Sequence, residues 1–177
     1  RELEAEKAKG RDITYTDSAV NFIGKLANGG MRDSLTLLEK ALAYSSDIND
    51  DNLAIALNLP NYDDYFKLLS AITKKDNAQI VAIIDAVYNS GVNFINWFEG
   101  FHAFVINIVS YIFLQDINRT KIPSQYKDRI SKYTTAHSAV CLKLSKMLLV
   151  LTHELKGTNY QQEVAITHLC VPQKPTK

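Results

Sequence analysis

Residues Val92 to Leu114 read VNFINWFEGFHAFVINIVSYIFL, and this stretch decides the fold class that the sequence predicts. Aromatic side chains recur in it at spacings of three and four residues, which places them along one side of a helix: Phe94, Trp97, Phe98, Phe101, Phe104 and Tyr111. The stretch is long enough to cross a membrane. It also contains a glutamate, three asparagines and a histidine, which make insertion into lipid costly. We therefore expect a long, mostly buried helix in a helical domain, and no membrane partner.

The same aromatic row has a second interpretation, as a surface on which nucleic-acid bases stack. Basic side chains are not interleaved with the aromatic ones, so core packing or a helix–helix interface is favoured.

Helical spacing of apolar residues continues on both sides of this stretch, and no segment alternates in the manner of a strand. The predicted class is all-α. Capping residues, glycines and prolines suggest the helix limits, with Asn28-Gly29-Gly30 as a clear break. The predicted helices cover about residues 17–27, 31–44, 50–57, 62–73, 77–88, 94–116, 125–132, 136–156 and 159–169.

A domain boundary is expected at Pro60, because proline cannot continue a helix and forces its predecessor into an extended conformation. Residues 1–59 would form a small helical domain, 60–171 a larger helical bundle, and 172–177 a polar tail. The first domain is barely large enough to be stable alone.

The composition excludes several classes of protein. The 177 residues include 20 Lys and Arg against 19 Asp and Glu, a balance unlike that of a strongly basic nucleic-acid binder. Cys141 and Cys170 lie in apolar surroundings without metal-ligand spacing, so we interpret both as small buried side chains and expect no metal. A cytoplasmic location fits the absence of a signal-peptide pattern, and the start at Arg1 suggests a fragment.

The sequence contains no GxxxxGK[ST], GxSxG or HExxH motif, so no catalytic residue is predicted. The four histidines are scattered and are interpreted as structural. Asp63 and Asp64 follow Pro60 at a helix start, where carboxylates stabilise the helix dipole. Lys127, Arg129 and Lys132 are interpreted as a solvated face.

Arg32 is the remaining candidate. It would lie in the first turn of a helix after a two-glycine break, where free backbone N–H groups attract anions and a guanidinium adds planar donors for phosphate. An ordinary salt bridge with Asp33, Glu39 or another neighbour is the alternative, and chemistry alone favours it.

The run ANGGMRDSLTLLEKALA, residues 27–43, resembles the sensor 2 region of the gamma/tau clamp-loader subunits of bacterial DNA polymerase III. The lead-in Ile13-Thr14-Tyr15 with Ala19 also fits that family. The departures from the family pattern are mild: Ser34, Thr36, Glu39, Lys40 and Leu42. The helical remainder of the chain is similar to the family's third domain in length and character.

The resemblance implies a truncated AAA+ helical lid over residues 1–59 and a collar (oligomerisation) domain over 60–171. Arg32 would contact the terminal phosphate of ATP, and Met31 would lie beside the nucleotide. The parent would bind ATP with Mg²⁺. The family's ATPase core, zinc module and arginine finger lie upstream of the matched segment, so this chain alone is expected to bind no cofactor and to hydrolyse no ATP.

The partners implied by the resemblance are the delta and delta-prime subunits and further gamma/tau copies, met through the collar. The whole assembly would open the sliding clamp and load it on primed DNA. Two alternatives stay open: a related subunit such as delta-prime, and a helical protein-interaction module without nucleotide chemistry.

Overall fold

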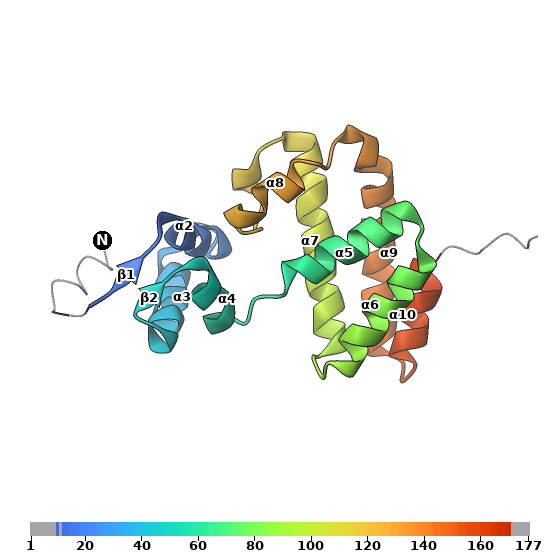
Figure 1. Ribbon diagram of the computed structural model, residues 1–177, viewed down its shortest axis with the longest axis horizontal. Coiled ribbons are helices and arrows are strands. Elements are labelled where there is room, and N and C mark those ends of the chain that lie inside the picture. Colours follow the sequence, from blue (N-terminus) through green and yellow to red (C-terminus); the bar gives the residue numbers. More distant parts are fainter. Residues whose placement is uncertain (1–9, 11, 171–177) are drawn as a thin grey trace, which may run out of the picture. The chain divides into compact units, whose positions relative to one another are not determined.

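The computed structural model describes residue 10 and residues 12–170, which divide into two compact units. The first unit comprises the chain up to Pro60 together with Asp116–Ser131, and the second comprises Asn61–Gln115 and the chain from Lys132 onward. Helices dominate both units (Figure 1), which confirms the predicted all-α class. The predicted polar tail, 172–177, lies outside the described residues.

The first unit contains the helices α2 (Asp17–Leu26), α3 (Met31–Tyr44) and α4 (Asp50–Ala56). They enclose a small core of side chains from all three helices and from β2 (Asp47–Ile48): Ala19, Phe22, Ile23, Ala41, Ile48 and Leu53. Thr16 caps α2 and Asn49 caps α4, each accepting a backbone N–H bond through its side-chain oxygen.

A two-stranded sheet in this unit was not predicted. β1 (Thr14–Tyr15) pairs in parallel with β2, with Thr14 opposite Asp47 and Tyr15 opposite Ile48. Each strand has only two residues, which is too short for alternation to appear in the sequence. The sheet joins the segment before α2 to the segment after α3.

The segment Asp116–Ser131 also belongs to the first unit, so the second unit is not the uninterrupted 60–171 domain of the sequence analysis. The segment contains two 3₁₀ turns, η1 (Ile117–Arg119) and η2 (Ser124–Tyr126), followed by the short helix α8 (Lys127–Ile130). The helix predicted over 125–132 is therefore partly 3₁₀. Local periodicity cannot assign such a segment to a unit, because that assignment depends on contacts distant in sequence.

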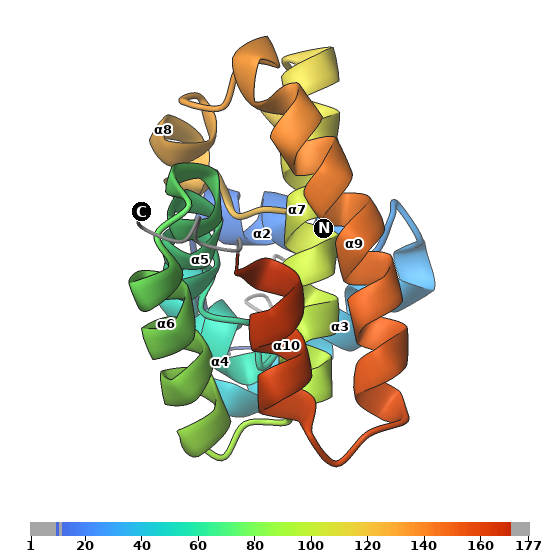
Figure 2. The same ribbon diagram turned by 90° about the vertical axis from the view of Figure 1, so that its right-hand side faces the viewer.

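The second unit is a bundle of α5 (Tyr62–Lys74), α6 (Asn77–Asn89), α7 (Phe94–Leu114), α9 (Ser138–Lys156) and α10 (Gln161–Leu169). Helix α7 packs along α9, α9 against α10, and α10 against α6, as Figure 2 shows. The 3₁₀ turn η3 (Thr135–His137) precedes α9.

Helix α7 supplies the core of this bundle. By length and composition it is the one helix among the described residues that could cross a membrane. It instead buries one face against the other helices: Phe94, Phe98, Phe101, Phe104, Val105, Ile108 and Ile112. Aromatic rings meet edge to face, with Tyr65 and Trp97 centroids 5.0 Å apart and Phe66 and Phe104 centroids 4.8 Å apart. Core packing, rather than base stacking, is confirmed for the four phenylalanines of the aromatic row, which are buried, whereas Trp97 and Tyr111 are half-buried.

Candidate functional site

The turn between α2 and α3 positions the candidate arginine. Asn28 and Gly29 both have positive φ, 51° and 78°, which reverses the chain after α2. The N–H of Gly29 donates to the carbonyl of Gly24 over 3.2 Å, and the N–H of Gly30 donates to that of Ala27 over 2.8 Å. These bonds satisfy the last carbonyls of α2, and α3 then begins at Met31.

The start of α3 has no side-chain cap. Gly30 occupies the cap position, and its carbonyl accepts both the N–H and the hydroxyl of Ser34, each over 2.9 Å. By contrast, the starts of α2, α4, α5, α6 and α7 are each capped by a side-chain oxygen. The first-turn N–H groups of α3 therefore remain available to an external acceptor such as a phosphate oxygen.

Met31 and Arg32 both face solvent at this point. Met31 is 74% exposed, and Arg32 is also exposed. Within the part of the chain that the structure describes, Arg32 forms no ion pair with Asp33, Glu39 or another carboxylate. The described residues therefore do not support the salt-bridge alternative for Arg32. Its guanidinium is accessible to a ligand.

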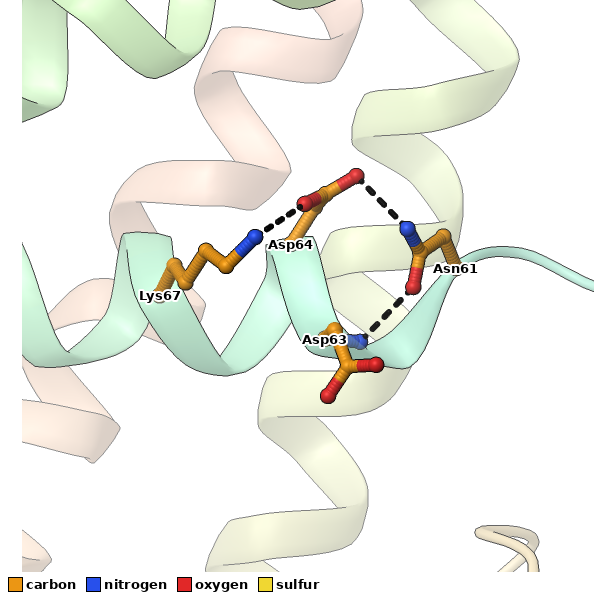
Figure 3. Close-up of polar contacts among 4 residues, drawn as sticks. All are labelled: Asn61, Asp63, Asp64 and Lys67. Carbon is orange, nitrogen blue, oxygen red and sulfur yellow. Dashed lines mark hydrogen bonds and ion pairs between the residues drawn. The ribbon is translucent and has the colours of Figure 1, made fainter.

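Asp63 and Asp64 lie in the first turn of α5 (Figure 3). Asn61 accepts the N–H of Asp63 over 3.1 Å and donates its amide to Asp64 over 3.0 Å. Lys67 pairs with the other oxygen of Asp64 at 3.2 Å. The two carboxylates thus point away from each other in the first turn of α5. This is expected for residues that stabilise a helix start.

Three of the four histidines contact neighbouring residues of the scaffold, and His153 is exposed. His137 accepts the N–H of Thr134 through Nδ1 over 3.2 Å, and His168 lies 3.2 Å from a carboxylate oxygen of Glu154. His102 lies 3.5 Å from the hydroxyl of Ser145, and burial lowers its pKa below the ordinary value. Among the described residues no three His, Cys, Asp or Glu side chains are grouped so that they could hold a metal ion.

One surface feature was missed by sequence reasoning. An open recess in the first unit lies along α2 and is completed by Asn118 from the distant segment: Ser18, Asn21, Phe22, Gly24, Lys25 and Asn118. Its only charged lining residue is Lys25. No local pattern could have indicated it, because Asn118 is far from α2 in sequence.

The comparisons with known proteins agree with the sequence resemblance. Residues 8–47 match the family described as DNA polymerase III clamp loader subunit, ATPase lid domain. The matched range contains the α2–α3 turn with Met31 and Arg32.

Three curated relatives extend the similarity. The chain is 30% identical to the DNA polymerase III subunit gamma of Buchnera aphidicola subsp. Schizaphis graminum over 46% of this chain and 23% of that protein. It is 25% identical to the DNA polymerase III subunit gamma/tau of Mycoplasma genitalium over 63% of this chain and 19% of that protein. It is 22% identical to Replication factor C subunit 4 of Encephalitozoon cuniculi over 63% of this chain and 36% of that protein.

The chain thus spans between 19% and 36% of the length of these relatives. The lid match and two of the three relatives point to clamp-loader subunits of DNA polymerase III, and the third relative is a replication factor C subunit. The chain is therefore similar to the gamma/tau clamp-loader subunits of DNA polymerase III, and its residues 8–47 are similar to a clamp-loader ATPase lid domain.

Proposed function

We propose that this chain works within a clamp loader, an assembly that uses ATP to open a sliding clamp and load it on primed DNA. The first unit would act as the lid over the nucleotide of an ATPase core. The second unit would join the subunit to its neighbours. The names of the relatives, two gamma-type subunits and a replication factor C subunit, support this class of function.

The observation that carries the proposal is the exposed Arg32 in the uncapped first turn of α3, inside the lid match. In this proposal the guanidinium of Arg32 binds the terminal phosphate of ATP. The planar donors of arginine suit phosphate oxygens, and the first-turn N–H groups add a favourable dipole. Met31, exposed beside it, would contact the nucleotide.

ATP with Mg²⁺ is proposed as the cofactor of the whole subunit. In this chain only Arg32 and Met31 are assigned to it, and the chain alone is expected to hydrolyse no ATP. The proposed partners are other clamp-loader subunits of the delta, delta-prime and gamma/tau kinds, with the clamp and DNA reached through the assembly. The proposed location is the cytoplasm, at the replication machinery.

The test uses the full-length subunit, assembled with its partner subunits in the presence of clamp and primed DNA. Arg32→Ala is expected to lower the ATPase rate by about tenfold or more, since tenfold corresponds to a loss of only about 1.4 kcal/mol of transition-state stabilisation. Lys40→Ala is the matched control, because Lys40 is an exposed cation on the same helix. It should leave the rate unchanged.

An Arg32→Ala variant with the wild-type ATPase rate would show that Arg32 is not a sensor. The gene sequence provides a simpler test of the class. A GxxxxGK[ST] loop encoded upstream of Arg1 is expected, and its absence would favour a helical interaction module instead.

A further inference from the structure

The solvent side of the α7–α9 pair has a defined geometry. Glu99 of α7 pairs with Lys156 of α9 at 2.7 Å, and His102 of α7 lies 3.5 Å from Ser145 of α9. Glu99, near the start of α7, thus meets the end of α9, whereas His102, further along α7, meets an earlier part of α9, and η3, just before α9, contacts α7 as well. The two helices are therefore antiparallel neighbours, as Figures 1 and 2 show, and these contacts mark the edges that meet.

On each helix, the residue that forms the ion pair belongs to a row of side chains spaced seven residues apart. On α7 the row that starts at Glu99 continues through Ile106 and Phe113. On α9 the row that ends at Lys156 runs back through Leu149 and Leu142. Seven residues make about two helical turns and a rise of about 10 Å. The ion pair taken alone would place Ile106 level with Leu149, whereas the contact of His102 with Ser145 would place it level with Cys141. Ile106 therefore lies between Leu149 and Leu142 along the helix pair, and Phe113 lies at or beyond Leu142 toward the start of α9.

These four large apolar side chains are all exposed: Ile106 by 46%, Phe113 by 60%, Leu142 by 39% and Leu149 by 64%. Their alignment places them together along the line where α7 and α9 meet, and we call this set the seam surface. Contiguous exposed apolar surface marks a place where another molecule binds. Scattered single residues would need no such explanation.

The two borders of the seam surface differ in charge. Lys146 on α9 lies one turn from both Leu142 and Leu149, and Lys143 lies one turn from Lys146 on its outer side. Both lysines are exposed, and within the described residues neither has an ion-pair partner. The corresponding border on α7 carries the uncharged residues Ala103, Asn107 and Ser110. The carboxylate of Glu99 is already paired with Lys156. The surface therefore presents an apolar strip with a basic border on one side only.

We propose that the seam surface binds an amphipathic helix of a partner protein, with its apolar stripe on the four seam residues and its carboxylates on the α9 border. A row spaced by two helical turns matches the repeat of apolar residues on such a helix. Carboxylates on the partner would pair with Lys143 and Lys146. A second copy of this chain fits less well, because its own seam surface offers no unpaired carboxylate to those lysines.

The test measures binding of a synthetic helical peptide to the whole chain by fluorescence anisotropy. The probe is an amphipathic peptide of about 20 residues, enough to span the surface, with a leucine stripe and glutamates along one edge. A matched peptide has lysines in place of the glutamates. The glutamate peptide is expected to bind about tenfold or more tightly than the lysine peptide. Leu149→Ser should weaken it about tenfold.

Val92→Ser is the matched control, since Val92 is an apolar residue of the same unit with 48% exposure and lies outside the seam surface. It should leave binding unchanged. The double substitution Lys143→Glu with Lys146→Glu should reverse the preference in favour of the lysine peptide. All of these positions are exposed, so the variants are expected to fold.

Equal affinity for both peptides, or undiminished binding by Leu149→Ser, would overturn the proposal. So would sedimentation showing that the chain alone dimerises and that Leu149→Ser abolishes the dimer, because a second copy would then be the occupant. The inference does not rest on the sensor role of Arg32. A negative peptide result would leave the ATPase test of that role unaffected.

Discussion

The hydroxyl of Tyr65 on α5 donates a hydrogen bond to the carbonyl oxygen of Trp97 on α7 over 3.0 Å. Tyr65 is almost fully buried, and the next turn of α7 presents Gly100 directly to its phenolic oxygen. A Cβ added at Gly100 would clash with that oxygen. The glycine thus provides the space in which the tyrosine reaches the backbone of α7, and this contact links two helices of the second unit.

The first prediction is that Gly100→Ala destabilises the chain. Alanine normally stabilises a helix interior by about 0.5–1 kcal/mol relative to glycine. Here the added methyl group would displace Tyr65, and overpacking of this kind costs about 1–3 kcal/mol. Urea titration followed by circular dichroism measures the change in the free energy of unfolding.

Gly24→Ala is the matched control, because Gly24 also lies inside a helix but has open space around its Cβ position. It should stabilise its unit or leave it unchanged. If Gly100→Ala were as stable as Gly24→Ala, the close approach of Tyr65 to Gly100 would not constrain the fold.

The second prediction concerns alkaline pH. Burial raises the pKa of Tyr65 above its ordinary value of 10. The neutral phenol is therefore favoured in the folded state, and its contribution to stability is fully present below pH 10. Above about pH 10 the unfolded chain releases this proton while the folded chain retains it. Stability should then fall by about 1.4 kcal/mol per pH unit from this group alone.

Tyr65→Phe removes this group and should flatten the decline above pH 10. At neutral pH the same substitution should cost about 1 kcal/mol, because the Trp97 carbonyl loses its donor. Urea titrations of both proteins at pH 8 and at about pH 10.5 measure the difference. An unchanged slope in Tyr65→Phe would assign the alkaline loss to other groups.

Much of the fold could be predicted because its signals are local. The limits of α3, 31–44, agree with the prediction, since Gly30 and the apolar spacing define them. The row from Phe94 to Phe104 was recognised as core from its spacing. The two-residue strands and the place of Asp116–Ser131 could not be predicted, because both depend on contacts distant in sequence.

The candidate site was predictable in part. Asn28-Gly29-Gly30 indicated the turn, and the structure places Arg32 just after it, exposed. The role of Arg32 stays a prediction, because its proposed ligand would be held by residues outside this chain. The seam surface could not be predicted either. Leu142 and Leu149 are two of many apolar residues in this helix, and only the packing of α9 against α7 shows that they are exposed beside α7.

The third prediction separates the two cysteines, which both lie in the second unit. Burial raises the pKa of the Cys141 thiol to about 11, and Cys141 is fully buried. Cys170, at the end of α10, is partly exposed. Because the thiolate is the reactive form, Cys170 should react with a disulfide reagent such as DTNB at pH 8, and Cys141 should react only after unfolding.

Cys170→Ser provides the control for this assignment. The variant should show almost no fast reaction in native buffer and one reactive thiol in denaturant. Equal rates for the two thiols in the native protein would contradict the burial of Cys141.

The last prediction concerns the turn that positions Arg32. Gly29 has a φ of 78° with open space at its Cβ position, so Gly29→Ala should cost about 1 kcal/mol through backbone strain alone. Asn28 has a φ of 51°, and asparagine tolerates this region better than alanine does. Asn28→Gly should therefore change stability by less than about 0.5 kcal/mol.

Thermal unfolding of the two variants tests the pair directly. If Gly29→Ala lowers the melting temperature and Asn28→Gly does not, the positive φ of Gly29 is required to begin α3 at Met31. Tolerance of alanine at Gly29 would mean that the turn adopts another conformation. In the assembled full-length subunit Gly29→Ala should also lower the ATPase rate, because Arg32 follows directly from this turn. Unlike Arg32→Ala, it should do so together with a lower melting temperature.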